Sequence, residues 1–288
     1  MHNSDLMQEL TIEAGKTERH YWADLWRFRE LFFFLSWRDI LVRYKQTVIG
    51  VLWAVLKPVL TAMVFVLVFT KLANMSTEGM PPLVFIYVAM LPWQFFSSSL
   101  SEASNSLITN SNMISKIYFP RLVIPASSVI VCFMDFLISA AILSLFLVWY
   151  HDWPTWRVLL LPAFTFLAFL ASFGMSLWLA ALNVKYRDFR YIIPFIVQFG
   201  MYGSPVGYGT DQVAGKFLEK GGEFGPWLLF LFNLNPMVGV INCFRWAFGS
   251  NVPFDGMSLL ISLVVTGLLI FSGVRYFRAT ERAFADII

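Results

Sequence analysis

The feature that most constrains this fold is a series of six strongly apolar stretches, each long enough to cross a lipid bilayer as a helix. They lie at about 51–72, 83–100, 121–149, 158–182, 192–208 and 257–274. An α-helix needs about 20 apolar residues to cross about 30 Å of hydrocarbon at 1.5 Å per residue. The third stretch is overlong, and the fifth is short and contains Gly and Pro. The sequence therefore predicts an all-α polytopic membrane protein with six transmembrane helices.

Composition supports this class, since 58% of the 288 residues are hydrophobic and 14% are charged. Soluble domains carry about 45–50% apolar and about 25% charged residues, so the surplus apolar surface needs lipid. A seventh apolar stretch, 226–248, is interrupted by side chains and a proline that are costly in hydrocarbon. We expect two short helices there that dip back into the protein, where broken backbone is tolerated. The interrupting residues are Asn233, Asn235, Pro236, Asn242 and Arg245.

The loop charges predict the orientation of the chain. Of the 21 Lys and Arg residues, 15 fall in the segments on the side of the N-terminus, five fall in the opposite segments, and Lys57 lies in the first span. Because positive charge accumulates in cytosolic loops, both ends are expected in the cytosol. The N-terminus lacks the apolar core of a signal peptide. The expected organisation is a polar tail (1–19), an interfacial helix (20–46), a transmembrane domain (47–277) with external helices at 211–250, and a cytosolic tail (278–288).

Residues 20–45 contain neither Gly nor Pro and show a one-sided aromatic pattern. At about 100° per residue, six side chains fall within about 60° of one another: Trp22, Trp26, Phe33, Trp37, Ile40 and Tyr44. Charged residues fall near the opposite side: Asp24, Arg27, Arg38 and Lys45. This pattern is typical of a helix lying in the cytosolic membrane interface, although a helix packed on the protein's own surface fits it as well.

Few residues support catalysis in this chain. Gly15-Lys16-Thr17 resembles the end of a phosphate-binding loop, but that loop needs a glycine where Leu10 stands. The three histidines are far apart, none of them lies in a span, and no close carboxylate pair suggests a metal site. We expect no enzyme activity, cofactor or metal in this chain. No Lys/Arg-dense stripe suggests nucleic acid, and the two cysteines are expected to be buried free thiols.

Three other features are candidates for function. Asp135 is the one clear carboxylate within a predicted span, so it either lines a polar path or hydrogen-bonds a neighbouring helix. The inner loops SEASNSLITNSNMISKIYFP and NVKYRDFRY either dock onto a soluble partner or simply turn the chain. Aromatic residues near the span ends, such as Trp53 and Trp93, are typical of interfacial belts, and some could instead line a conduit and stack on sugars.

Five blocks of the sequence resemble a known family. They are WRDILVRYKQTVIGVLWAVLKPVLTAMVF (37–65), LPWQFFSSSLSEASNSLITNSNMISKIYFPRLVIPASSV (91–129), LNVKYRDFRYIIPFIVQFGMYGSPVGY (182–208), NPMVGVINCFRWAFG (235–249) and TERAFADII (280–288). Together they are similar to the permease of bacterial ABC-2 exporters, which move O-antigen, capsule or teichoic acid chains. The resemblance implies a homodimer in the bacterial inner membrane with two copies of a separate ATPase that binds ATP and magnesium.

The resemblance also assigns roles to residues. It implies that 105–116 is a helix that couples to the ATPase and that 185–190 is a second contact; the candidates are Asn105, Asn110, Asn112, Met113, Lys116, Lys185, Arg187 and Asp188. The expected substrate is a glycan on a polyprenyl diphosphate, whose head group needs cations at the cytosolic interface; Arg38, Arg43 and Lys45 are placed to supply them. Candidates for the channel or its external gate are Trp53, Asp135, Tyr208, Asn235, Pro236 and Arg245. An exporter of small lipids or drugs, or a membrane enzyme acting on lipid-linked sugars, remains an alternative.

Overall fold

The computed structural model describes residues 21–45, 48–186, 188–281 and 284, and all regular structure in these ranges is helical. The polar tail with Gly15-Lys16-Thr17, residue Arg187 and most of the C-terminal tail lie outside the described residues. The elements are α1 (Tyr21–Arg27), α2 (Arg29–Lys45), α3 (Val48–Phe65), the π-helix η1 (Val66–Leu72), α4 (Pro82–Thr109), α5 (Ser111–Ile114), α6 (Val123–Tyr150), the 3₁₀ helix η2 (Trp156–Leu160), α7 (Leu161–Lys185), α8 (Phe189–Tyr202), α9 (Thr210–Lys220), the 3₁₀ helix η3 (Gly222–Phe224), α10 (Gly225–Asn233), α11 (Pro236–Phe248) and α12 (Gly256–Thr280).

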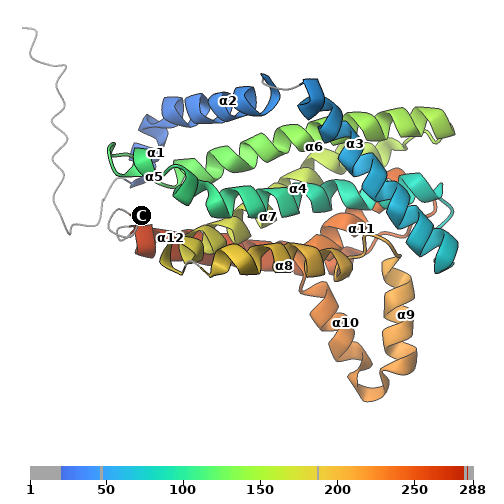
Figure 1. The fold of residues 1–288 in the computed structure, drawn as a ribbon. Helices are drawn as coiled ribbons and strands as arrows, with labels where there is room; N and C mark the ends of the chain where they lie inside the picture. The colour runs from blue at the N-terminus through green and yellow to red at the C-terminus, as the bar shows by residue number, and fades with distance from the viewer. Residues whose placement is uncertain (1–20, 46–47, 187, 282–283, 285–288) are drawn as a thin grey trace, which may run out of the picture.

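The predicted class, an all-α polytopic membrane protein, is confirmed. Within the described ranges, five helical segments are long and apolar enough to cross a membrane: Val55–Leu72, Pro82–Thr109, Val123–Tyr150, Trp156–Lys185 and Gly256–Thr280. A sixth candidate is the pair formed by Gly222–Asn233 and Pro236–Phe248, which is bent by 80° at its break. The long helices run side by side in one bundle, from which α9 and α10 project (Figure 1).

Both ends of the described chain meet at the same end of this bundle. The Tyr21 hydroxyl donates a hydrogen bond to Glu281 at 3.0 Å, and the Arg278 guanidinium lies 4.4 Å from the centre of the Tyr21 ring. Short α5 lies at this end too (Figure 1), which we call the α5 end; the opposite end, which holds α11, we call the α11 end. A chain that starts and finishes at one end must cross an even number of times.

Besides the five long helices, α8 and the segment after it also lead from the α5 end to the α11 end, which gives an even number of passages along the bundle. Helix α8 has 14 residues, about 21 Å, which is too short to cross the hydrocarbon alone. It packs beside α4, with Gly200 against the ring of Trp93. The segment 203–209 then continues to the start of α4, where Arg245 contacts both this segment and Phe85. The stretch predicted as a helix at 192–208 thus ends at Tyr202, because Pro205 disfavours helical backbone before it.

The second span also differs from its predicted bounds, since α4 has 28 residues and continues through Thr109. The polar residues after Leu100 do not stop the helix because their side chains bond back to it. Ser101 donates to the Ser97 carbonyl at 3.0 Å, and Asn105 donates to the Ser101 carbonyl at 2.8 Å. At about 42 Å in length, α4 extends well beyond about 30 Å of hydrocarbon.

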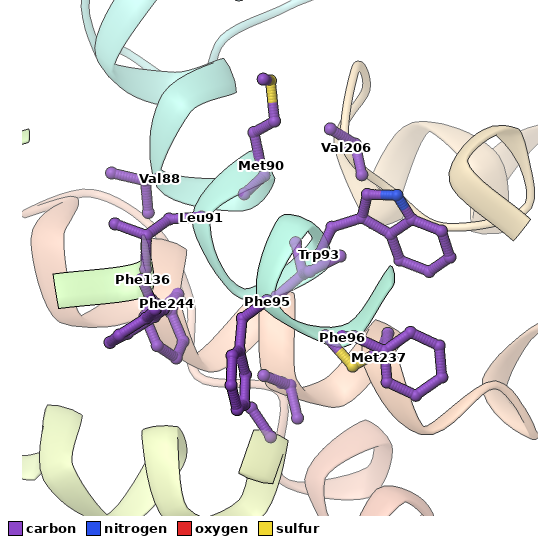
Figure 2. Close-up of a cluster of buried hydrophobic side chains, with 14 of the residues drawn as sticks. Val88, Met90, Leu91, Trp93, Phe95, Phe96, Phe136, Val206, Met237 and Phe244 are labelled. Carbon is purple, nitrogen blue, oxygen red and sulfur yellow. The ribbon is translucent and has the colours of Figure 1, made fainter. Parts of the chain in front are cut away.

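Helix α4 forms the centre of the core, packed against α6, α7 and α11. Phe95 lies within 6.2 Å of three other ring centres, those of Phe133, Phe136 and Phe169. Figure 2 shows Trp93 on the side of α4 that faces Val206, while Phe95 points toward Phe136. Long apolar helices in lipid gain little from excluding water from one another, so close packing of this kind must hold them together.

Helices α7 and α12 approach most closely at two glycines. A Cβ atom on Gly174 would lie 2.8 Å from the Ile270 nitrogen, and one on Gly273 would lie 2.6 Å from the Gly174 carbonyl oxygen. One turn away, Trp178 stacks on Tyr276 with ring centres 4.3 Å apart and donates to the Ser272 hydroxyl at 3.0 Å. Such small residues let two backbones meet, as is common between membrane helices.

We predict that Gly273→Ala will lower the melting temperature of the detergent-purified protein. The added methyl group meets rigid backbone, and overpacking of this kind costs about 1–3 kcal/mol. Gly267→Ala is the matched control on the same helix, because a Cβ there meets nothing within 4 Å. Equal melting temperatures for the two variants would contradict the close α7–α12 contact.

Candidate functional site

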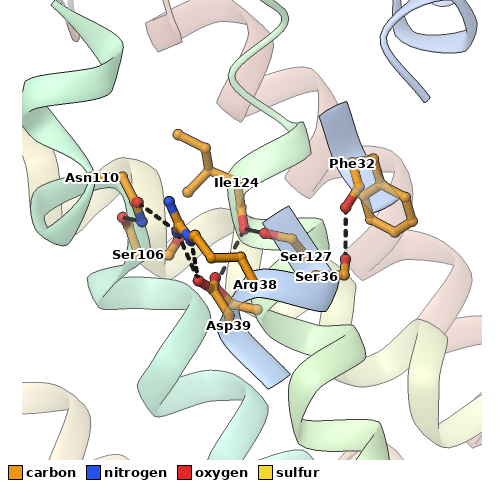
Figure 3. A network of polar contacts seen from close by, with 9 residues as sticks. Phe32, Ser36, Arg38, Asp39, Ser106, Asn110, Ile124 and Ser127 are labelled. Atoms are coloured by element: carbon orange, nitrogen blue, oxygen red, sulfur yellow. Dashed lines mark hydrogen bonds and ion pairs between the residues drawn. The ribbon is translucent and has the colours of Figure 1, made fainter. Parts of the chain in front are cut away.

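The first candidate site lies where α2 packs against α4 and α6. Arg38 donates from its Nε to the Asp39 carboxylate at 2.8 Å and from a terminal nitrogen to the Asn110 side-chain oxygen at 3.3 Å. Asn110 in turn donates to the Ser106 carbonyl at 2.9 Å. Figure 3 shows this chain of contacts joining α2 to the end of α4. The guanidinium of Arg38 therefore ties the helix to the bundle and is already paired.

Arg43 is paired as well, with two carboxylates from two helices. Its terminal nitrogen lies 3.2 Å from Oδ2 of Asp135 on α6 and 3.5 Å from Oε1 of Glu102 on α4. Tyr44 donates a short hydrogen bond to the other oxygen of Asp135. Burial and this hydrogen bond raise the pKa of the Tyr44 hydroxyl above its ordinary value. Of the two roles open to Asp135, the structure shows bonding to a neighbouring helix.

Lys45 differs from these two arginines, since it is exposed at the end of α2 and makes no ion pair with any residue that the structure describes. Several aromatic side chains of the predicted stripe are exposed too: Trp22, Trp26, Phe33 and Trp37. The stripe is carried by two helices, because the direction changes at Phe28 between α1 and α2. Leu35 and Ser36 are buried on the side facing the bundle, so α2 packs on the protein with its aromatic side outward.

The predicted coupling residues that the structure describes separate into half-buried and exposed groups. Asn105 lies within α4 and accepts a hydrogen bond from Asn183 of α7 at 3.0 Å, and Asn110 is held by Arg38. Met113, within α5, is half-buried, whereas Asn112 and Lys116 are exposed. Two residues that the sequence reasoning missed, Ile117 and Tyr118, are apolar yet exposed at 59% and 43%. Their signal in the sequence is the apolar pair in an otherwise polar loop.

The second inner loop lies beside the first. Asn183, at the base of this loop, donates to the Ser104 carbonyl at 2.9 Å, which joins the ends of α7 and α4. Lys185 and Asp188 are exposed, and the Lys185 ammonium lies 5.2 Å from the centre of the Tyr186 ring. Asn112, Lys116, Ile117 and Tyr118 together with Lys185, Tyr186 and Asp188 form what we call the α5-end surface.

The second candidate site lies at the α11 end, around the buried Arg245. This side chain is 1% exposed, and its terminal nitrogens donate to the carbonyls of Tyr208 at 2.7 Å and Val206 at 3.1 Å. Its guanidinium carbon lies 3.8 Å from the centre of the Phe85 ring on α4. One side chain thus joins α11, α4 and the irregular segment after α8, so Arg245 holds the 203–209 segment in place.

Neighbouring residues complete this second site. Asn235 caps α11 by accepting from the Met237 amide at 3.0 Å, and it donates to the Ser204 hydroxyl at 2.8 Å. Pro236 occupies the first turn of α11, where its missing N–H costs nothing. Burial raises the pKa of the Glu78 carboxyl, while attraction to Arg245 opposes the rise. Tyr208, Asn235, Pro236 and Arg245 are therefore brought together, as one group of the predicted gate residues.

The other two of the six predicted channel or gate residues lie elsewhere. Trp53 is exposed on α3, at 57%, and Asp135 belongs to the cluster with Arg43. Helix α3 is lightly packed, since 17% of the window Val55–Leu72 is buried. The six channel or gate candidates thus occupy three places on the structure, because residues far apart along different spans need not share a level in the bundle.

A long apolar bundle with an exposed loop surface at one end and a sharply bent helix pair at the other has the architecture of a multi-pass membrane protein. Residues 30–249 match the family model described as ABC-2 type transporter. This match covers most of the chain, so the protein belongs to the ABC-2 type transporter family.

The curated proteins to which the chain is similar are permeases by name. The chain is 26% identical over 265 residues to the "O-antigen export system permease protein RfbA" of Myxococcus xanthus, covering 92% of this chain and 98% of that protein. It is 29% identical over 248 residues to a protein of the same name from Klebsiella pneumoniae, covering 83% of this chain and 90% of that protein. These similarities extend over nearly the whole length of both relatives.

We predict that Arg245→Leu will free the 203–209 segment without unfolding the bundle. The substitution leaves two buried carbonyls without a donor, at a cost of about 1–3 kcal/mol each. Hydrogen exchange followed by mass spectrometry should show faster exchange of the Val206–Thr210 amides. Arg190→Leu, on an exposed side chain of α8, is the control and should leave exchange in this segment unchanged. Slow exchange in Arg245→Leu would show that Arg245 does not hold the segment.

Proposed function

We propose that this chain is the membrane-spanning permease of an ATP-driven exporter that moves a lipid-linked O-antigen glycan out of the cytosol. The observation that carries the proposal is the near full-length similarity to permeases of O-antigen export, on a chain with the spans of a transporter. ATP hydrolysis would occur on a separate subunit, present in two copies on a homodimer of this chain. In this arrangement the protein lies in the bacterial inner membrane.

The proposed orientation places the α5 end in the cytosol. The positive-inside rule favours this side, because the charged loops and both ends of the described chain are found there. The diphosphate of the carrier would arrive at the C-terminal part of α2, where Lys45 is exposed and Arg38 and Arg43 lie close by. The glycan would then cross at the interface of two copies and leave past the 203–209 segment, near Arg245.

The α5-end surface is the proposed docking site for the ATPase. It combines an exposed cation, Lys116, with exposed apolar side chains at Ile117 and Tyr118, a mixture typical of protein interfaces. The two loops rest on α4 and α7, which are joined by the Asn183 hydrogen bonds. A movement imposed on these loops by the ATPase would therefore reach the centre of the bundle through rigid helices.

The first test of this function is deletion of the gene followed by analysis of cellular lipids. We expect a long glycan on a polyprenyl diphosphate to accumulate on the cytosolic side, since synthesis continues while export stops. Lipid extraction with mass spectrometry would also identify the sugars. Normal surface glycan, with accumulation of a small lipid or of a polyol phosphate instead, would favour another ABC-2 substrate.

We also predict that Lys116→Glu will uncouple ATP hydrolysis from export. Charge reversal at an exposed docking residue disturbs the contact with the ATPase but leaves the bundle folded. Purified complexes should retain basal hydrolysis while glycan export into vesicles falls by about ten-fold or more, as expected when an interface charge is reversed. Lys216→Glu, on exposed α9 at the other end, is the matched control. Full export by Lys116→Glu would contradict docking through this loop.

A further inference from the structure

Arg43, a cation of the proposed entry site, is already paired with two carboxylates. A cation that is to bind a diphosphate must be able to leave its present partners, yet Arg43 lies between Asp135 at 3.2 Å and Glu102 at 3.5 Å. Its side chain is 35% exposed and that of Glu102 is 56% exposed, so both are reachable from outside the bundle. The pairing is therefore exchangeable.

This pairing lies at the C-terminal end of α2. Arg43 and Tyr44 are among the last residues of α2, and α3 starts at Val48. Both side chains bind the same carboxylate, with Tyr44 on Oδ1 and Arg43 on Oδ2 of Asp135. The window Val55–Leu72 has the smallest buried fraction of the candidate spans, so the end of α2 adjoins a lightly packed part of the protein.

We propose that Asp135 and Glu102 act as a releasable anchor for Arg43, and that an arriving lipid diphosphate takes Arg43 from them and loosens the C-terminal end of α2 from α6. The inference rests on the proposed function, because it requires a diphosphate carrier at α2. Asp135 and Glu102 are positioning residues in this scheme. They touch no substrate, and they set the affinity of the entry site by competing for its guanidinium.

The chemistry favours such an exchange. A guanidinium binds phosphate oxygens through two parallel charge-assisted hydrogen bonds, whereas both of the present carboxylates lie near a single terminal nitrogen of Arg43. When Arg43 swings away, Tyr44 still donates to Asp135, so the carboxylate does not lose its last hydrogen bond. The end of α2 then keeps one of its two bonds to Asp135. A ligand shifts the equilibrium between two conformations only if it binds one of them better. Here the diphosphate would bind better to the conformation in which Arg43 has left the two carboxylates.

The test measures binding of farnesyl diphosphate, with farnesol as the uncharged comparison, to the full chain assembled with its ATPase in lipid nanodiscs. Arg43→Ala should weaken binding of farnesyl diphosphate by about ten-fold or more, since charge-assisted hydrogen bonds are lost. Glu102→Gln should tighten it by about two- to five-fold, because an exposed competing ion pair is removed. Asp135→Asn should tighten it further, and its amide oxygen still accepts from Tyr44.

A merely structural role for the two carboxylates predicts the opposite result, namely unchanged or weaker binding when they are neutralised. Glu30→Gln makes the same charge change on an exposed carboxylate at the start of α2 and should leave binding unchanged. Because Asp135→Asn could fail to assemble, Glu102→Gln provides the independent arm. Unchanged binding by Glu102→Gln would overturn the competition between the carboxylates and the diphosphate.

The loosening of the end of α2 has its own measurement. Spin labels on Val42→Cys and on Leu145→Cys, both at exposed positions, report the distance between the last turn of α2 and the far part of α6. Farnesyl diphosphate should broaden that distance distribution, and Asp135→Asn should broaden it without ligand. An unchanged distribution would refute the release. If the unmodified complex binds farnesyl diphosphate no better than farnesol, the proposed entry site itself fails; if only the carboxylate variants have no effect, the anchor alone fails.

Discussion

The structure depends on one constraint, that polar groups inside a hydrocarbon layer must find partners within the protein. Helix α4 shows how the chain meets it, with serine and asparagine side chains bonded to carbonyls of their own helix. Where the backbone leaves helical geometry after α8, a buried arginine supplies the missing donors. The buried arginine lies at the α11 end and the Asp135 cluster lies under the end of α2, while the core around Phe95 is held by packing.

The bundle combines a close-packed centre with lightly packed parts. The centre, around Phe95 and the Gly174–Gly273 contact, is close-packed and suited to transmit a rigid displacement. Helix α3, in contrast, has few buried residues, and the end of α2 is held by polar bonds to Asp135. Movable parts must come from the weakly held elements, and here these are next to the proposed entry of the carrier.

The two ends are built differently for the same reason. At the α5 end, exposed loops carry Lys116, Ile117 and Tyr118 outward, as a surface for a soluble partner requires. At the α11 end, Arg245 turns inward and is shielded by the Phe85 ring, as closure of a path requires. Under the proposed function, the first end would receive force from the ATPase and the second would control the exit of the glycan.

The sequence alone determined the class, because the length and apolarity of a span are local properties that any neighbour leaves unchanged. It also pointed to the break at Asn235-Pro236 and to Asp135 as exceptional, since polar groups in such stretches are costly wherever they point. Only the tertiary structure decided that Arg43 and Tyr44 share Asp135, that Asn105 faces α7, and that α4 continues through Thr109. These outcomes depend on which helices pack against each other, and the pattern of residues along one chain does not determine that.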